Sequence, residues 1–351
     1  MTTVTVNASR QYDIHIGPGL LSSLGSEAVK LGRAKQVCLV SETNVHPLYG
    51  AQAEKSLRDA GLQVCSFVFE AGEARKNGET YLRLLGFLAE NRLTRTDLVA
   101  ALGGGVTGDL AGFAAATYLR GVRMIQLPTT LLAAVDSSVG GKTAIDLPEG
   151  KNLAGAFCQP SLVLCDTDTL RTLPRDVFLD GCGEVIKYSV LYDRALFDSL
   201  RETGPDFHRE DVIRRCVEMK RDVVAEDEYD TGARRKLNLG HTVGHGVEAR
   251  SGFAVSHGKA VSIGLAIVSR AAAKFGLCSR ETADSIVELI RRFGLPTETA
   301  YSAEELYGYT LSDKKRTGDT VALIVPREIG NCEVRTLPVE ALEDWIKAGL
   351  K

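Results

Sequence analysis

The chain has 351 residues, 44% of them hydrophobic and 25% charged, which is ordinary for a globular protein of about two domains. The formal net charge of −3 gives no overall basic character, so nucleic acid is not an expected partner. No apolar run reaches the length of a membrane span, and the eight dispersed cysteines form no C-x-x-C pair, which predicts reduced thiols and no membrane association.

The first half of the chain alternates short apolar runs with helical patterns. Residues 1–17 alternate apolar and polar positions around a turn, which predicts a β-hairpin rather than a signal peptide. Further strands are expected at 34–41, 62–70, 97–104 and 123–128, and helices at 49–61, 78–93 and 108–121. The strands are continuous apolar runs, which is typical of a parallel sheet buried on both faces.

After about residue 175 the pattern becomes mainly helical. Helical spacing covers residues 175–202, 210–227, 241–252, 257–276 and 280–294, and only residues 319–337 favour strands. The predicted fold class is therefore α/β, with an N-terminal Rossmann-like nucleotide-binding domain (1–175). A C-terminal, mainly α-helical domain for metal and substrate (176–351) follows.

A glycine-rich turn follows the strand expected at 97–104. Gly103, Gly105 and Gly108 have the G-x-G-x-x-G spacing that lets a backbone approach a pyrophosphate at a helix N-terminus. The acidic residue usual about 20 positions later is absent, but Glu42 follows an earlier strand and is a candidate ribose ligand. A tight turn without a ligand is the alternative. The later G-K-T sequence is not a P-loop, because Asp136 stands where that motif needs its first glycine.

Three of the six histidines, His241, His245 and His257, fall within 17 residues of the helical half. The spacing of the first two resembles the zinc-protease pattern H-E-x-x-H, but Thr242 stands where its glutamate would be. Catalytic zinc uses three protein ligands, and Glu184 is a candidate acid. The alternative is that these are ordinary polar residues on half-buried helices.

Basic residues accompany the metal candidates. Lys187 follows Glu184 by three positions, which places both on one helix face, either as an ion pair or as part of a site. Arg234, Arg235 and Lys236 precede His241 and are either a solvated face or the binding site of an anion. A dinucleotide, a divalent metal and an anionic substrate together favour oxidation of an alcohol.

These motifs, taken together, resemble the 3-dehydroquinate synthase family over nearly the whole chain. The matching blocks occur in the family's order: GGGVTGDLAGFAAATYLRG, QLPTTLLAAVDSSVGGKTAID, GKNLAGAFCQP, DTLRTLP, GCGEVIKY, LNLGHTVGHGVE and HGKAVSIG. The family is a phosphorus–oxygen lyase of the shikimate pathway of aromatic amino acid biosynthesis. It converts 3-deoxy-D-arabino-heptulosonate 7-phosphate into 3-dehydroquinate and phosphate. The steps are transient oxidation by NAD⁺, phosphate elimination, re-reduction and intramolecular aldol closure.

The resemblance implies residue roles. The metal, Zn²⁺ or Co²⁺, is expected on Glu184, His241 and His257, with His245 facing the substrate phosphate. The other implied substrate residues include a carboxylate-binding set (Lys220, Arg234 and Asn238), phosphate contacts (Arg120 and the Lys314–Lys315 pair), and Asp136, Lys142, Asn152 and Lys187.

The resemblance also implies an NAD⁺ pocket. Its expected residues are Glu42, Asn44, Gly72, Glu73, Lys76, Gly105, Val106, Thr107, Gly108, Asp109, Thr129, Thr130, Lys142, Lys151, Thr169, Leu170, Arg171 and Thr172. Two positions depart from the family pattern, since Thr107 replaces a common aliphatic residue and Glu42 replaces a common aspartate. A homodimer and a cytoplasmic location are implied in the same way.

Three rival functions remain at this stage. Other sugar-phosphate cyclases, such as 2-deoxy-scyllo-inosose synthase or a sedoheptulose-phosphate cyclase, act on substrates without a carboxylate, which Lys220 and Arg234 disfavour. A metal-dependent alcohol or glycerol-phosphate dehydrogenase would release NADH instead of recycling it. A dinucleotide sensor with a structural metal would bind NAD⁺ without any turnover.

Overall fold

The computed structural model describes residues 1–310, 316–317 and 319–350. The chain forms two compact units, each of two segments. The first unit comprises Met1–Pro174 and Arg209–Tyr229, and the second comprises Arg175–His208 and Asp230–Lys351. The predicted division at residue 175 did not anticipate that 209–229 belongs with the first unit. This segment carries helix α7 (Arg209–Glu226), which packs on strand β1 (Thr2–Val6) and on the turn Ala133–Ser137.

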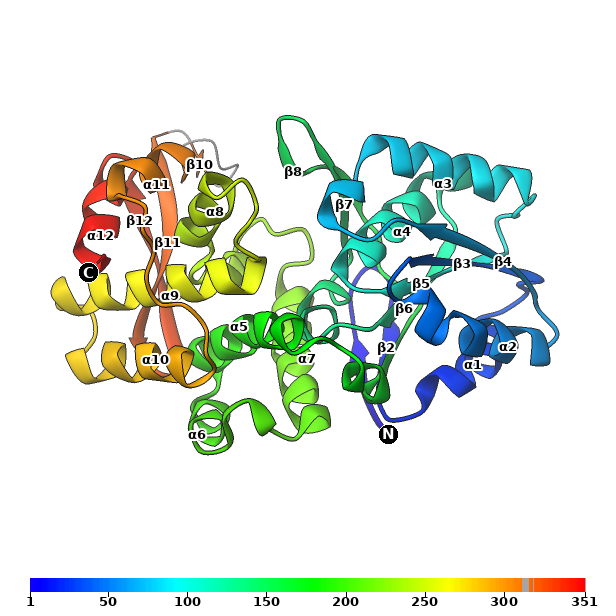
Figure 1. The fold of residues 1–351 in the computed structure, drawn as a ribbon, viewed down its shortest axis with the longest axis horizontal. Coiled ribbons are helices and arrows are strands. Elements are labelled where there is room, and N and C mark those ends of the chain that lie inside the picture. The colour runs from blue at the N-terminus through cyan, green and yellow to red at the C-terminus, as the bar shows by residue number, and fades with distance from the viewer. Residues whose placement is uncertain (311–315, 318, 351) are drawn as a thin grey trace. The chain divides into compact units, whose positions relative to one another are not determined.

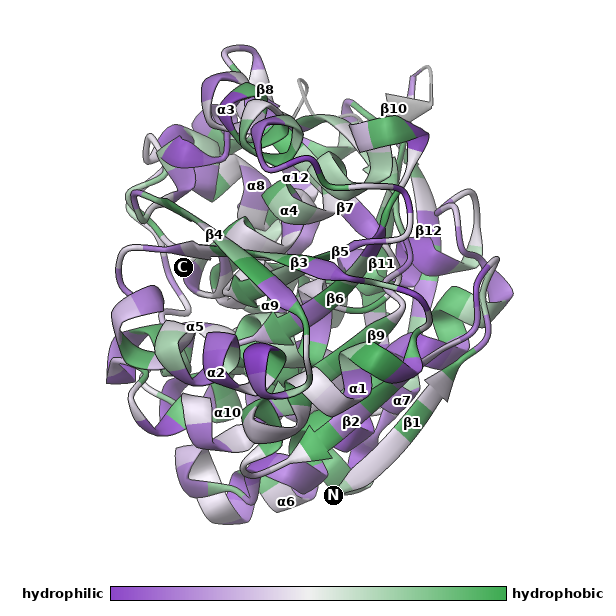
Figure 2. Cartoon of the chain, turned by 90° about the vertical axis from the view of Figure 1, so that its right-hand side faces the viewer, coloured by the Kyte–Doolittle hydropathy of each residue, from purple (hydrophilic) through white to green (hydrophobic). Residues whose placement is uncertain are grey.

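A sheet of seven strands forms the centre of the first unit in its described residues. The strand order is β1-β2-β9-β6-β5-β3-β4, and every pairing except that of β1 with β2 is parallel. The other strands are β2 (Tyr12–Gly17), β3 (Gln36–Glu42), β4 (Gln63–Phe69), β5 (Leu98–Gly103), β6 (Arg123–Pro128) and β9 (Leu162–Asp166). Figure 2 shows hydrophobic residues along β2 and β9.

Helices cover both faces of this sheet (Figure 1). Val37 and Leu39 of β3 point to the face covered by α1 (Leu24–Lys30) and α2 (Ala51–Asp59). The alternate residues, Cys38 and Val40, pack in the core on the other face, beneath α3 (Gly78–Glu90) and α4 (Gly105–Thr117). The two apolar faces explain why the strands read as continuous hydrophobic runs, and the parallel α/β prediction is confirmed.

Three strands of this unit were not predicted. Strands β7 (Lys142–Leu147) and β8 (Gly150–Phe157) form an antiparallel hairpin, and β9 completes the sheet. Much of β8 is exposed and it contains two glycines, so it lacks the hydrophobic signal on which the strand predictions depended.

The second unit is mainly helical. Its helices are α5 (Arg175–Tyr192), α6 (Arg194–Thr203), α8 (His241–Arg250), α9 (His257–Lys274), α10 (Arg280–Arg292), α11 (Ala303–Thr310) and α12 (Ala341–Gly349). The predicted single helix at 175–202 is two helices, because Asp193 caps α6 by accepting a hydrogen bond from the Leu196 amide at 2.9 Å.

Helix α9 lies in the hydrophobic core of the second unit, and most of its residues are buried. β10 (Arg316–Thr317), β11 (Thr320–Glu328) and β12 (Asn331–Pro338) form an antiparallel sheet. β11 and β12, which the strand pattern at 319–337 predicted, contribute residues to that core. Among the described residues, no helix combines the length and the apolar character that crossing a bilayer requires.

Candidate active site

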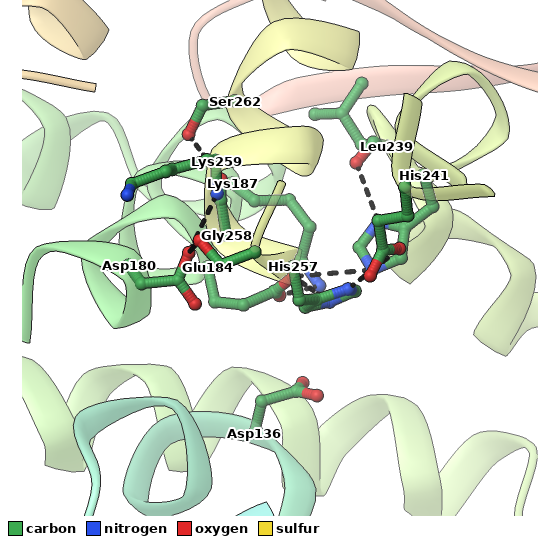
Figure 3. A network of polar contacts seen from close by, with 12 residues as sticks. Asp136, Asp180, Glu184, Lys187, Leu239, His241, His257, Gly258, Lys259 and Ser262 are labelled. Carbon is green, nitrogen blue, oxygen red and sulfur yellow. Dashed lines mark hydrogen bonds and ion pairs between the residues drawn. The ribbon is translucent and has the colours of Figure 1, made fainter. Parts of the chain in front are cut away.

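Two glycines allow α5 and α9 to approach closely in the second unit. A Cβ atom on Gly258 would lie 1.7 Å from the Asp180 carbonyl oxygen, and one on Gly183 would lie 2.5 Å from the Gly258 carbonyl oxygen. Any larger residue would push the helices apart. The close approach brings Glu184, the next residue of α5, against His257, the first residue of α9 (Figure 3).

A second close crossing brings α8 to the same place. A Cβ atom on Gly264 of α9 would lie 2.0 Å from the Gly240 carbonyl oxygen, which directly precedes α8. Gly240 itself has a φ of 78°, a left-handed conformation that favours glycine. The chain therefore turns sharply into α8 beside α9, and His241 begins α8 next to His257.

Glu184, His241 and His257 present a donor set suited to a divalent metal. The Glu184 Oε1 atom lies 3.3 Å from the Nε2 atom of each histidine, and one donor atom from each residue lies within 4.8 Å of the others. Ligands of a tetrahedral zinc ion, about 2.1 Å from the metal, stand roughly 3.4 Å apart. Two imidazoles and one carboxylate form a zinc-type catalytic set, so these residues fit the predicted metal.

His241 and Glu184 each make a second contact that fixes their orientation. The Nδ1 atom of His241 lies 3.1 Å from the Leu239 carbonyl oxygen, which leaves Nε2 toward Glu184. The Lys187 ammonium forms an ion pair with Oε2 of Glu184, the oxygen turned away from the imidazoles. Glu184 and Lys187 are almost completely buried, so this charge arrangement is protected from water.

Carboxylates also control the charge of His257. Burial opposes protonation of its imidazole, but hydrogen bonds to Glu184 and Glu248 and the charges of these two groups outweigh burial and raise the pKa of His257 to about 10. Two carboxylates around one imidazole make this pocket strongly attractive to a cation.

Three further predicted residues belong to the second unit. The rings of His245 and His241 lie 5.5 Å apart between centroids, which is the expected spacing one turn along α8. Arg234, which is buried, and Asn238 share the single short helix Ala233–Asn238 just before α8. The predicted phosphate contacts Lys314 and Lys315 lie outside the described residues.

The glycine turn of the first unit lies at the start of α4, directly after β5. A Cβ atom on Gly103 would lie 2.4 Å from the Thr107 hydroxyl, and one on Gly105 would lie 3.1 Å from the Ser137 hydroxyl. The turn is therefore a narrow backbone cradle at a helix N-terminus, which suits a pyrophosphate. Thr107 is buried against the turn.

A buried lysine connects several of the predicted NAD⁺ residues. The Lys76 ammonium, on a side chain 5% exposed, lies 3.1 Å from Glu73, 3.2 Å from Asp109 and 2.8 Å from the Asn152 amide oxygen. Burial opposes its charge, but the carboxylates of Asp109, Glu73 and Asp146 raise the pKa of Lys76 above its usual range. Burial raises the pKa of Asp109 to about 6, although Lys76 opposes that shift.

Other predicted NAD⁺ residues lie at loops after the parallel strands. Glu42 ends β3 and accepts a hydrogen bond from the Asn44 amide at 2.6 Å. Tyr49 donates to the Thr169 carbonyl oxygen at 3.1 Å, which anchors the stretch that also contains Leu170, Arg171 and Thr172. Ligands of parallel α/β sheets bind at these carboxyl ends. The remaining members are Gly72, Val106, Gly108, Thr129, Thr130 and Lys151, and the Lys151 ammonium lies 3.6 Å from Glu73.

The predicted substrate residues of the first unit include both buried and exposed side chains. Lys220 of α7 is buried and donates to the Asp136 carbonyl oxygen at 2.7 Å and to its carboxylate at 2.9 Å. Lys142 and Arg120 are exposed. Arg120 and Asn152 have positive φ angles of 65° and 54°, in the left-handed region that few non-glycine residues adopt.

Three acidic residues that hold candidate site residues within their own units were not predicted from the sequence. Asp180 accepts hydrogen bonds from the Lys259 amide at 2.9 Å and the Ser256 hydroxyl at 2.5 Å, which fixes the start of α9. Asp146 accepts a hydrogen bond from the Asn152 amide at 2.8 Å. Glu248 contacts His257. Glu248 stands three residues after His245, but only the fold shows that it faces a different histidine.

The fold and the donor set define a class: proteins that combine a Rossmann-like unit with a helical unit in which a glutamate and two histidines could hold a divalent metal. Two family models match adjoining parts of the chain, 3-dehydroquinate synthase N-terminal at residues 66–180 and 3-dehydroquinate synthase C-terminal at 181–316. The chain is 40% identical over 352 residues to a 3-dehydroquinate synthase of Streptococcus suis strain 05ZYH33, covering 98% of this chain and 99% of that protein. The chain belongs to the 3-dehydroquinate synthase family.

Solved structures agree in fold. A 2-deoxy-scyllo-inosose synthase complexed with carbaglucose-6-phosphate, NAD⁺ and Co²⁺ has a TM-score of 0.89 at 24% identity, covering 99% of this chain and 100% of that chain. A 2-epi-5-epi-valiolone synthase from Streptomyces hygroscopicus subsp. jinggangensis 5008, with NAD⁺ and Zn²⁺ bound, has a TM-score of 0.89 at 25% identity, covering 99% and 98%. The predicted family, fold class and enzymatic nature are confirmed by these comparisons.

Proposed function

We propose that this chain performs the reaction of its family with Glu184, His241 and His257 as metal ligands. It converts 3-deoxy-D-arabino-heptulosonate 7-phosphate into 3-dehydroquinate and phosphate, with NAD⁺ and Zn²⁺ or Co²⁺ as cofactors. The observation that carries the assignment of residues is the 3.3 Å approach of both imidazoles to one buried carboxylate oxygen. A metal held by these ligands would lower the pKa of a substrate hydroxyl, and bound NAD⁺ would supply reversible hydride transfer.

Lys187 orients the metal-binding carboxylate. Its ammonium holds Oε2 of Glu184, so Oε1 is the oxygen left for the metal, and rotation of the carboxylate would break that ion pair. The ammonium also offsets the negative charge of Glu184 in a site that water does not reach. Lys187 thus orients Glu184, and we also assign it a contact with the substrate.

The substrate carboxylate is assigned to Lys220, Arg234 and Asn238. The first two are buried cations, and Lys220 is held in place by Asp136 before any substrate arrives. A positioned cation loses little freedom on binding, which favours an anionic group over water. His245, Arg120, Lys142 and Asn152 complete the proposed substrate contacts, with His245 and Arg120 toward the phosphate.

The NAD⁺ site is assigned to the first unit. The glycine cradle at the start of α4 would hold the pyrophosphate through backbone N–H groups, and Glu42 would accept hydrogen bonds from a ribose. Lys76 fixes Glu73 and Asp109 on one side of this region. We also propose that the enzyme is cytoplasmic and homodimeric, as the resemblance implied.

The test measures phosphate release from 3-deoxy-D-arabino-heptulosonate 7-phosphate by the purified chain with NAD⁺ and Zn²⁺ or Co²⁺. We expect metal-dependent formation of phosphate and 3-dehydroquinate, no net NADH, and loss of turnover after chelation. Net NADH would instead indicate a dehydrogenase. Binding of NAD⁺ and metal without phosphate release would contradict the proposed substrate and favour another sugar phosphate or a sensor.

The His257→Ala variant tests the metal assignment. We expect it to keep its fold but to bind metal and turn over substrate at least about a hundredfold less well, because a ligand is lost. His15→Ala is the matched control, since His15 lies in β2 of the first unit and contacts Thr3. Metal stoichiometry and circular dichroism accompany the assay. A folded His257→Ala variant with full metal binding would refute the assignment.

A further inference from the structure

Glu248 lies behind the proposed metal site, on the last turns of α8. It is 5% exposed, and its Oε2 atom lies 3.4 Å from Nδ1 of His257. The other nitrogen of the same ring, Nε2, faces Oε1 of Glu184 at 3.3 Å. The imidazole of His257 is therefore held between two carboxylates on opposite edges, and only one of these belongs to the proposed ligand set.

The two histidines of the site are supported in different ways. The Nδ1 atom of His241 faces the Leu239 carbonyl oxygen, whereas that of His257 faces the Glu248 carboxylate. A carbonyl or carboxylate that accepts the Nδ1 proton fixes the tautomer, so Nε2 carries the lone pair for a metal. A carboxylate also raises the electron density of the ring, which a neutral carbonyl does less.

The backbone of Glu248 also shapes the connection to His257. Its carbonyl oxygen accepts a hydrogen bond from the Phe253 amide at 2.8 Å and another from the Ser251 hydroxyl at 2.8 Å. This turn contains Gly252 and Phe253, both with positive φ angles, and leads directly to the start of α9. The main chain of Glu248 thus closes the turn that precedes α9, while its side chain contacts His257 itself.

We propose that Glu248 is a positioning residue for the metal site, which holds His257 by accepting the Nδ1 proton. The inference rests on the proposed ligand set of Glu184, His241 and His257. Glu248 does not touch the metal position; it acts through the orientation and basicity of His257. The sequence alone assigned it no role.

A second metal site is the competing explanation for this carboxylate. Donor atoms of His245, Glu248 and His257 also lie within 4.8 Å of one another. That site would need Nδ1 of His257 as a ligand while Nε2 binds the first metal. A neutral imidazole has only one free lone pair, so both sites could be filled only by a fully deprotonated ring. The hydrogen-bonded arrangement avoids this cost and is favoured.

The experiment compares Co²⁺ binding by the full-length wild-type chain and by Glu248→Gln, Glu248→Asp and a control. Dissociation constants come from chelator competition, and the visible absorption of bound Co²⁺ reports the ligand geometry. We expect Glu248→Gln to bind Co²⁺ about 10- to 100-fold more weakly with an altered spectrum, and Glu248→Asp to recover part of the loss. Affinity for NAD⁺ should not change.

The matched control is Glu305→Gln. Glu305 pairs with Arg250 of α8 at 2.8 Å, so this variant also removes a carboxylate next to α8, but not the one at His257. It should bind Co²⁺ like the wild type. Wild-type Co²⁺ affinity and spectrum in Glu248→Gln would overturn the proposal. So would two Co²⁺ ions per wild-type chain, with the second lost in both His245→Ala and Glu248→Gln.

The outcome also separates this inference from the assignment on which it rests. If the wild-type chain binds one Co²⁺ and His257→Ala does not, the ligand set stands whatever Glu248→Gln does. If His257→Ala binds Co²⁺ as well as the wild type, the ligand set itself is wrong, and the role of Glu248 fails with it.

Discussion

A single buried carboxylate, Glu184, organises the charges of the second unit's site. One oxygen faces two imidazoles and the other faces the Lys187 ammonium. Burying such a group is costly unless cations surround it, and a divalent metal would complete that compensation. Burial of Glu184 therefore costs stability, and the same burial favours binding of a metal. Its neighbours determine that Oε1 is the oxygen that faces the metal position.

Residue types and spacing predicted some of these contacts but not others. Glu184 with Lys187, and His241 with His245, are pairs within one helix, so their proximity follows from helical geometry. The proximity of His241 to His257 across two helices came from the family resemblance. Glu248 and Asp180 were missed because acidic residues on helices are common, and nothing local to the sequence shows which of them faces a histidine.

Asp97 shows how a single carboxylate also supports the first unit. It is 4% exposed and accepts hydrogen bonds from the amides of Thr94 (2.7 Å), Lys35 (3.1 Å) and Gln36 (3.0 Å), where β3 and β5 begin. Burial alone would raise its pKa, but these hydrogen bonds outweigh burial and lower the pKa of Asp97 below its ordinary value. The ionised form is therefore the one that stabilises the fold.

We expect Asp97→Asn to destabilise the chain by about 1.5–3 kcal/mol at pH 7, because buried hydrogen bonds to a charged group are lost. The pKa of Asp97 is lower in the folded chain than its ordinary value of ~4, so the ionised carboxylate stabilises the fold at pH values above that ordinary value. This stabilisation is lost as the pH falls through the pKa of Asp97 in the folded chain. The deficit should therefore shrink toward pH 3. Urea unfolding at both pH values measures it.

The control for this prediction is Asp59→Asn. Asp59 pairs with Lys55 on the exposed face of α2, and such pairs contribute less than about 1 kcal/mol. Its unfolding midpoint should change little at either pH. An equal deficit for Asp97→Asn at pH 7 and pH 3 would show that packing, rather than charge, explains its effect.

At the scale of elements, helix crossings place the site. Glu184 and His257 meet because Gly183 and Gly258 let α5 and α9 approach, and His241 joins them because Gly264 admits the start of α8. The positions of the helices could be predicted from the spacing of hydrophobic residues. Their crossings did not, since a glycine inside a helical pattern does not indicate which helix will pack against it.

We expect the Gly258→Ala variant to keep its secondary structure but to bind Zn²⁺ at least about tenfold more weakly than the wild type. Its melting temperature should also be lower. The added methyl group would collide with the Asp180 carbonyl oxygen, and overpacking of this kind costs about 1–3 kcal/mol or more. Because backbone is the obstacle, α9 must move and carry His257 with it. Isothermal titration with Zn²⁺ and thermal unfolding measure the two effects.

Gly86→Ala is the matched substitution for this test. Gly86 lies in the exposed middle of α3, where an added Cβ would meet nothing within 4 Å. Alanine is favoured over glycine inside a helix by about 1 kcal/mol, so this variant should melt slightly higher and bind Zn²⁺ normally. Normal Zn²⁺ affinity in Gly258→Ala would mean that the crossing tolerates a wider spacing than the structure indicates.

At the scale of the whole molecule, two units divide the ligands between them. The proposed metal ligands all belong to the second unit, whereas the glycine cradle and the Lys76 cluster belong to the first. The alternation of strands and helices predicted this change of architecture near residue 175. It did not predict that α7 returns to the first unit, because helical spacing shows that a helix has an apolar face but not which core receives it.

This division predicts separate protection patterns in hydrogen exchange. Zn²⁺ should slow exchange in α5, α8 and α9, and NAD⁺ should slow exchange around residues 72–76 and 105–109. The reason is that each ligand stabilises the unit that binds it, by about 2.7 kcal/mol when its concentration is a hundred times its dissociation constant. In His241→Ala, the Zn²⁺ effect should disappear while the NAD⁺ effect remains, which excludes general unfolding as the cause. Zn²⁺ protection confined to the first unit would contradict the ligand assignment, because the donor set there would have to be a different one.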